Sequence, residues 1–296
     1  MKIKIFTDTS ILWRDSGTKL ALNKSDLFEL KDIRFIQKYQ REIIKDGYVV
    51  VYAHERHVRQ INQIVKGSIS QVKLILWTND WVPFKFLEGM PNCYYLAPFK
   101  IKEKNKFSNI KFKHVTQPGH AFDSEMIFED CDVAFYGTLG WDIPQHNHRN
   151  EVVKKILENT YSKIFFKRSD DNMPMSRGYF DFKTLVESQS NAYRAAKFSI
   201  CASQDQEGAT HCQSNRLFNI MASGGCPLVW RNEGVEDFIQ DGLNGRIFDT
   251  PEHALEIINK TTRSESDRMK KESFSSFKKK HTVEVLYSQL KQTIDS

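Results

Sequence analysis

The sequence predicts an α/β protein built of two halves, each with a mainly parallel sheet covered by helices. Short apolar runs that read as strands alternate with segments that carry apolar residues at helical spacing. This alternation is typical of doubly wound, Rossmann-like folds. Several runs, such as YVVVYA at residues 48–53, are continuous and β-branched, as in strands buried on both faces. The 296 residues exceed the size of one small core, so two domains are expected.

The first half is expected to span residues 1–128 and to begin with the strand KIKIFT. Apolar residues at helical spacing between 26 and 46 predict a helix that stops at Gly47. The strands of this half are expected at residues 2–7, 48–53, 73–77 and 92–98, with a second helix at 56–65.

The second half is expected to span residues 129–266. Its strands are expected at residues 132–137, 163–168, 197–203, 226–230 and 245–249, and its helices at 149–159, 182–195, 216–222, 235–240 and 251–260. A closing helix is expected over residues 267–294, and its apolar face carries Val283, Leu286, Leu290 and Ile294.

Composition narrows the class of protein. Hydrophobic residues make up 40% of the chain and charged residues 27%, a profile of globular rather than disordered chains. The longest apolar runs are too short to span a bilayer and no signal-peptide pattern is present, so a cytoplasmic protein, expected to be a monomer, is predicted. The five cysteines lack CxxC spacing, which favours free thiols over disulfides or zinc. The net charge of +6 permits an anionic partner without requiring one.

The most informative stretch is NRLFNIMASGGCPLVW, residues 215–230. It reads as a helix, a glycine pair that allows a sharp turn, and a buried strand. Arg216 falls in the first helical turn, where the helix dipole favours acids. The long polar loop before it leads to a helix N-terminus, a place that binds anions. We therefore expect a negatively charged ligand at Arg216; the alternative is an ordinary connection with a surface salt bridge.

Together with the run NEGVEDFIQDGLNGRIFD that follows, this stretch resembles the nucleotide-sugar-binding half of GT-B glycosyltransferases, over residues 215–260. Within that fold, DVAFYGT at 132–138, the pair Arg149 and Glu151, and LILWTNDWVPF at 74–84 are similar to the DNA β-glucosyltransferases of T-even phages. The resemblance implies two Rossmann-like domains facing a central cleft, with residues 267–296 returning to the first domain. It also implies that the protein works inside a phage-infected host cell.

The resemblance further implies a donor site. Arg216 would contact the diphosphate, and Asn219 replaces a family glutamate that binds the ribose, so that this contact is neutral here. The other residues it places at the donor are Arg149, Gly137, Thr138, Asp205 and His211. The alternatives are a loop-capping role for Asp205 and a solvated loop histidine for His211. The implied donor is a nucleotide-diphosphate sugar, UDP-glucose first, with no tightly bound cofactor; a divalent metal is compatible but not required.

Transfer to a hydroxyl needs a carboxylate that takes the acceptor's proton. Asp80, after the strand at 73–77, is the first candidate, and Asp8, after the first strand, is the second. The phage resemblance implies hydroxymethylated pyrimidines in double-stranded DNA as acceptor, with Trp81 and Phe84 stacking beside a flipped base. The lysine-rich segment at 99–114 would then meet phosphates; the alternative is a solvated edge strand. Two other hypotheses stay open: transfer to a cell-surface glycan or small acceptor, and a GT-B module that binds without catalysis.

Overall fold

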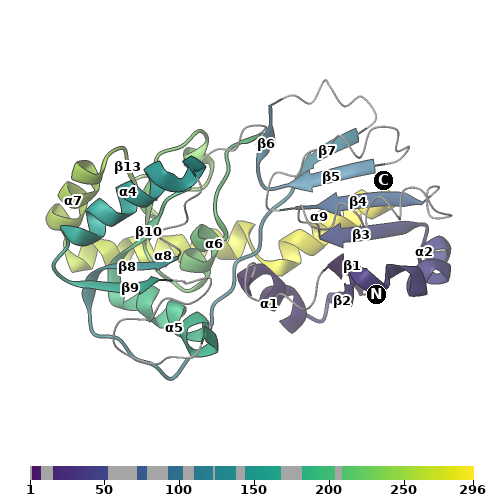
Figure 1. Ribbon diagram of the computed structural model, residues 1–296, viewed down its shortest axis with the longest axis horizontal. Helices are drawn as coiled ribbons and strands as arrows, with labels where there is room; N and C mark the ends of the chain where they lie inside the picture. Colours follow the sequence, from purple (N-terminus) through teal and green to yellow (C-terminus); the bar gives the residue numbers. More distant parts are fainter. Residues whose placement is uncertain are drawn as a thin grey trace. The chain divides into compact units, whose positions relative to one another are not determined.

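The computed structural model describes residues 2–7, 16–52, 72–78, 93–102, 110–122, 124–137, 144–167, 182–203 and 209–296. The chain forms two compact units. Unit 1 consists of Met1–Pro118, Asp205–Cys212 and Lys280–Ser296, and unit 2 of Gly119–Gln204 and Gln213–Lys279. Each unit carries its own parallel sheet with helices packed on it, so the predicted α/β fold with two Rossmann-like domains is confirmed (Figure 1).

Unit 1 is built on a six-stranded sheet in the order β2-β1-β3-β4-β5-β7, in which all pairs are parallel. The strands are β1 (Ile3–Thr7), β2 (Phe28–Asp32), β3 (Tyr48–Tyr52), β4 (Lys73–Trp77), β5 (Cys93–Ala97) and β7 (Ile110–His114). The described helices are α1 (Ser16–Lys24), a 3-10 helix (Ile33–Tyr39), α2 (Gln40–Asp46) and α9 (Val283–Asp295).

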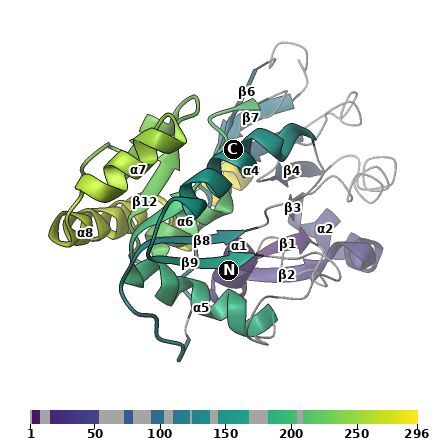
Figure 2. The same cartoon turned by 60° about the vertical axis from the view of Figure 1, so that its left-hand side comes forward.

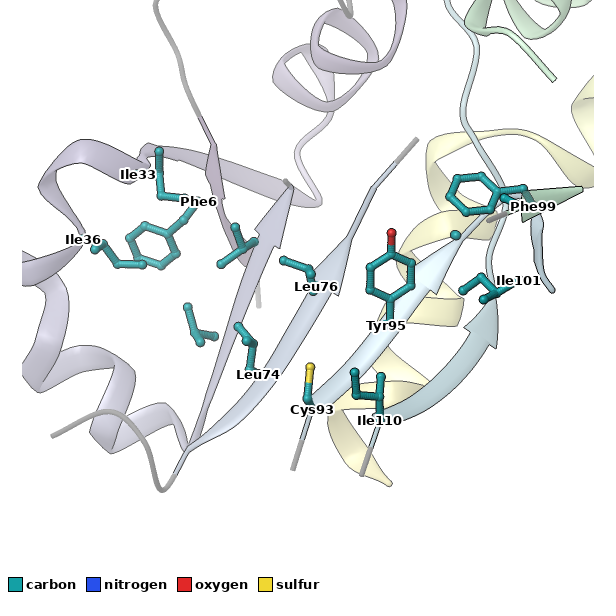
Figure 3. Close-up of a cluster of buried hydrophobic side chains, with 14 of the residues drawn as sticks. Phe6, Ile33, Ile36, Leu74, Leu76, Cys93, Tyr95, Phe99, Ile101 and Ile110 are labelled. Atoms are coloured by element: carbon teal, nitrogen blue, oxygen red, sulfur yellow. The ribbon is translucent and has the colours of Figure 1, made fainter. Parts of the chain in front are cut away.

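The sheet of unit 1 is buried on both faces, as its continuous apolar strands predict. Along β3, Val49 and Val51 join the core cluster of one face, which Figure 3 shows. Val50 lies in the cluster of the other face, where Leu286 and Leu290 of α9 pack. The apolar stripe of α9 is thus buried against this sheet.

The predicted helix at 26–46 is wrong in its first part. Residues Phe28–Asp32 form strand β2, which pairs in parallel with β1. Phe28 and Leu30 both contribute to one core face, so a two-residue period governs this stretch. The side chains of Ile33 and Ile36 are buried on the other face of the sheet. Together with Phe28 and Leu30 they give an apolar spacing that resembles that of one long helix.

A segment from beyond β10 also belongs to unit 1. Strand β11 (Ala209–Thr210) pairs antiparallel with β6 (Lys100–Ile101). The side chains of Ala209 and Cys212 are buried in the core of this unit. The sequence predicts a loop of the second half at these residues. Local sequence patterns do not reveal their pairing with β6, because that strand lies far away in the sequence.

Unit 2 has a five-stranded parallel sheet in the order β13-β12-β10-β8-β9. The strands are β8 (Cys131–Gly137), β9 (Lys163–Lys167), β10 (Ala196–Cys201), β12 (Pro227–Trp230) and β13 (Arg246–Phe248). Helices α4 (Pro144–Glu158) and α7 (Pro251–Lys260) cover one face (Figure 2). The other face carries α5 (Phe182–Ala195) and α6 (Asn215–Ala222), together with Phe277 of α8 (Arg263–Lys280).

The single closing helix expected over 267–294 is two helices, α8 in unit 2 and α9 in unit 1. Thr282 caps α9 through a hydrogen bond that its side chain accepts from the Val285 backbone N–H, which favours a new helix start there. His281 is buried between the helices and hydrogen-bonds Thr116 Oγ1 through Nδ1 at 2.8 Å. Tertiary contacts therefore divide into two helices a stretch whose sequence pattern predicts one continuous helix.

All five cysteines are free and buried, in agreement with the prediction. Burial raises the pKa of Cys93 and of Cys226 to about 12 in each case, so neither thiol is a ready nucleophile. Within the described ranges, no group of three or more histidine, cysteine or acidic side chains is placed to hold a metal ion. None of the helices described is both long and apolar enough to cross a bilayer.

Candidate functional site

The topology of unit 2 predicts where a ligand binds. Strands β9 and β10 lie on opposite sides of β8. Connections that leave β8 and β10 therefore run in opposite directions, and ligands of open α/β sheets bind at the carboxyl ends of the strands at such a switch point. Gly137 ends β8, and the chain after β10 leads to α6 with Arg216 in its first turn.

Arg216 is held at the end of β8 by two contacts. Its Nε donates to the backbone carbonyl of Tyr136 at 2.6 Å. Its guanidinium carbon lies 4.6 Å from the centroid of the Phe135 ring, a cation–π distance. No carboxylate among the described residues forms a salt bridge with Arg216. The alternative role expected for Arg216, a surface salt bridge, is therefore not seen within these residues. Ser214, the residue before α6, makes no side-chain cap either.

Arg149 of α4 brings a second guanidinium to the same place. Its pKa is lowered to about 10, first because the side chain is withdrawn from water and second because the positive charge of Arg216 lies close by. Its Nη2 donates to Asn150 Oδ1 at 3.0 Å, and no described carboxylate pairs with it. Two like charges beside each other without an acid raise the free energy of the empty site. A bound anion would relieve this repulsion.

Gly137 is the residue that makes room for Arg216. A methyl group placed on its Cα would lie 2.4 Å from Arg216 Nη2 and 2.9 Å from Phe135 Cζ. Glycine at this position therefore lets the guanidinium approach the strand end. The sequence predicts a turn at Gly137, but the contact with Arg216 depends on two segments almost 80 residues apart.

Replacing Gly137 with alanine should displace the guanidinium of Arg216, whose Nη2 is the atom nearest to the added methyl group. The protein should stay folded, because the atoms that must shift belong to two side chains and not to the backbone. We expect the affinity for an anionic ligand of this site to fall by about 1 kcal/mol, as measured by isothermal titration calorimetry. In the background of Arg216→Ala, the same substitution should have almost no further effect. Full additivity of the two changes would contradict the proposed contact.

Asn219 has a structural partner that the sequence did not reveal. Its side chain is buried, and Oδ1 accepts a hydrogen bond from the backbone N–H of His120 at 3.1 Å. The neighbouring Gly119 packs directly on α6, since a methyl group there would lie 2.1 Å from the carbonyl oxygen of Phe218. Segment 119–122 thus lies across the helix that carries Arg216. Contact of Asn219 with a ribose stays a prediction.

Replacing Gly119 with alanine should lower the free energy of unfolding of unit 2 by about 2 kcal/mol, since overpacking against backbone atoms cannot relax. Urea denaturation followed by circular dichroism measures it. Glu125→Ala is the control, because this exposed side chain lies a few residues further along the same segment and its loss should cost less than about 0.5 kcal/mol. Equal stability of the two variants would show that segment 119–122 does not pack tightly on α6.

His211 lies in unit 1 and not in the unit that contains Arg216. Its Nε2 is 2.7 Å from Lys100 Nζ, and its Nδ1 is 3.1 Å from Thr210 Oγ1. Its φ of 62° is in the left-handed region, which few residues other than glycine adopt. The predicted contact of His211 with the donor therefore stays a prediction. Six other site predictions fall outside the described residues: Asp8, Asp80, Trp81, Phe84, Thr138 and Asp205.

Comparisons with known proteins bear on the family and on the fold. Residues 186–292 match a family model described as glycosyl transferase-like. The structure of HepE from Anabaena, in complex with UDP and glucose, is 9% identical; the match covers 100% of this chain and 99% of HepE, with a TM-score of 0.59. A glycosyltransferase from Rickettsia africae gives 9% identity, coverage of 99% and 98%, and a TM-score of 0.50.

A TarM variant from S. aureus, in complex with fondaparinux, α-GlcNAc-glycerol and UDP, is 11% identical with a TM-score of 0.57. The match covers 89% of this chain and 59% of TarM, so the chain spans less than two thirds of the length of that protein. No curated protein matches the sequence. Neither the family match nor these structures support the narrower likeness to the phage DNA enzymes. The chain therefore has the GT-B fold, and its residues 186–292 match a glycosyl transferase-like family.

Proposed function

We propose that this protein is a glycosyltransferase that takes its sugar from a nucleotide-diphosphate sugar. The observation that carries the proposal is the pair Arg149 and Arg216, two guanidinium groups without a described acidic partner at the carboxyl end of β8. The pair lies at the switch point of a GT-B sheet and at the start of α6, where a diphosphate is favoured. UDP-glucose is the first donor to test, since HepE binds it.

The chemistry follows from the charges. When the bond between sugar and diphosphate breaks, negative charge grows on the diphosphate, and two fixed guanidinium groups lower the free energy of that state. The orientation of Arg216 by Tyr136 and Phe135 means that little reorganisation is needed during the reaction. A carboxylate is still required to take the proton of the acceptor hydroxyl. Asp80 is our first candidate for this base and Asp8 the second.

For the acceptor we propose a hydroxyl of a glycan or of a small molecule. The complex of TarM with α-GlcNAc-glycerol supports an acceptor of this kind. The lysines of β7, which would meet DNA phosphates in the other hypothesis, have roles within unit 1. Lys111 Nζ donates to Tyr94 Oη at 3.1 Å, and Lys113 Nζ donates to Ser296 Oγ at 3.3 Å. These contacts favour a structural role over a nucleic-acid surface.

The test begins with titration of the protein with UDP and a panel of UDP-sugars, followed by measurement of UDP release. Each donor that binds is then incubated with glycan acceptors and with hydroxymethylated DNA, and the products are analysed by mass spectrometry. Sugar on a glycan supports the proposal. Sugar on DNA instead would restore the DNA hypothesis, and donor binding without release or transfer would indicate a module that only binds. The absence of binding to any nucleotide sugar would overturn the proposed function.

A further inference from the structure

Gln213, two residues before α6, has a buried hydrogen-bond acceptor that the protein leaves unused. Its side chain is 7% exposed. The amide nitrogen Nε2 donates to Asn232 Oδ1 at 2.8 Å. The amide oxygen Oε1 is buried and has no hydrogen-bond partner among the described residues. A buried acceptor without a donor is costly, so a group that is not part of the described protein is expected to supply the hydrogen bond.

The position of Gln213 places its side chain at the same edge of the sheet as the two arginines. The backbone N–H of Ser214, the next residue, donates to Ser203 Oγ at 2.9 Å, just beyond the end of β10. Asn232, which holds the amide, follows the end of β12 by two residues. Gln213 therefore lies at the carboxyl edge of the sheet, where β10 and its neighbour β12 end, and three residues from Arg216.

A ring contact connects the end of β12 with the helix of the second arginine. The centroids of His148 and Trp230 lie 5.1 Å apart with the rings nearly perpendicular. His148 precedes Arg149 on α4, and Trp230 is the last residue of β12. The strand end that holds Gln213 through Asn232 thus borders the place where the two guanidinium groups meet. A nucleotide-diphosphate sugar bound there carries a nucleoside on one side of the diphosphate and a sugar on the other, and both bear hydroxyl groups.

We propose that Gln213 Oε1 accepts a hydrogen bond from a hydroxyl of the bound nucleotide sugar, and that Gln213 contributes to donor selectivity. The inference rests on the proposed function. Because Nε2 is engaged by Asn232, the amide presents only its acceptor to the ligand. A ribose hydroxyl and a hydroxyl of the transferred sugar offer the same chemistry. A ligand without this hydroxyl leaves the acceptor unsatisfied and binds more weakly.

The experiment is calorimetric titration of three proteins with UDP and with UDP-glucose. Gln213→Met keeps the length of the side chain and removes its acceptor. Gln189→Met is the matched control, since Gln189 is a buried glutamine of the same unit whose Oε1 is satisfied by Tyr193 Oη at 3.3 Å. We expect Gln213→Met to weaken binding roughly tenfold and Gln189→Met to leave the affinity unchanged. Thermal unfolding of each variant verifies that it is folded.

The two ligands separate the two sources of the hydroxyl. If Gln213→Met binds both ligands more weakly, the hydroxyl belongs to the ribose. If it binds only UDP-glucose more weakly, the hydroxyl belongs to the transferred sugar. Unchanged affinity of folded Gln213→Met for both ligands would overturn the inference. If this variant does not fold, the unaltered protein is titrated with UDP-glucose analogues that each lack one hydroxyl. One analogue must then bind roughly tenfold more weakly, and equal affinity for all of them overturns the inference. Failure of the unaltered protein to bind either ligand would instead contradict the proposed function itself.

Discussion

Replacing Asp80 with asparagine should slow sugar transfer by roughly 10²–10⁴-fold, the usual contribution of a positioned general base. Asparagine keeps the size of aspartate and one acceptor oxygen but cannot take a proton at neutral pH. Donor affinity should hardly change, because the diphosphate is expected to bind to Arg149 and Arg216. Single-turnover rates with saturating UDP-glucose, together with titration by UDP, measure the two quantities separately.

Asp8→Asn is the parallel variant, because both carboxylates follow strands of the same sheet, β1 and β4. A slow Asp80→Asn beside an active Asp8→Asn supports the first candidate. The reverse result assigns the base to the loop after β1 and shows that the resemblance of LILWTNDWVPF to the phage loop is misleading. If both variants transfer sugar at full rate, the base is a different residue.

Replacing Arg216 with alanine should weaken donor binding by about 1–3 kcal/mol, the contribution of a charge-assisted hydrogen bond. The rate of transfer should fall further, by roughly 10²–10³-fold, because the guanidinium stabilises charge that develops only as the bond breaks. Folding should be nearly unaffected, since the side chain bonds to the protein only through the Tyr136 carbonyl and the Phe135 ring among the described residues. Titration with UDP-glucose and steady-state kinetics give both numbers.

Arg231→Ala is the matched control for this change. It removes the same charge from the same unit, but Arg231 is exposed and already paired with Glu236 and Asp249. Its loss should leave both affinity and rate unchanged. Arg216→Lys should recover part of the affinity because it keeps the positive charge. It should not restore the hydrogen bond to the Tyr136 carbonyl or the contact of a planar guanidinium with the Phe135 ring. Unchanged donor affinity in folded Arg216→Ala would remove the basis of the proposed diphosphate site.

The sequence by itself determines the fold class and the location of Arg216. Continuous apolar strands such as YVVVY, and the run from residue 215 to 230, are local patterns, and local patterns are sufficient for parallel strands, a helix start and a cation in its first turn. The same patterns give a wrong prediction where the apolar residues of a stretch fit both the helical and the two-residue period. Residues 28–32 carry the spacing of a helix, but pairing with β1 makes them a strand.

Only the tertiary structure decides which groups meet. The contact of Arg216 with Tyr136, the place of Arg149 beside it, and the bond from His120 to Asn219 each join residues from 67 to 99 positions apart, and no local pattern records them. Strand β11 (Ala209–Thr210) likewise joins unit 1 because β6 offers an edge to pair with, which no local sequence pattern records. Periodicity determines what each segment becomes; the free energy of packing between distant segments determines which side chains share a site.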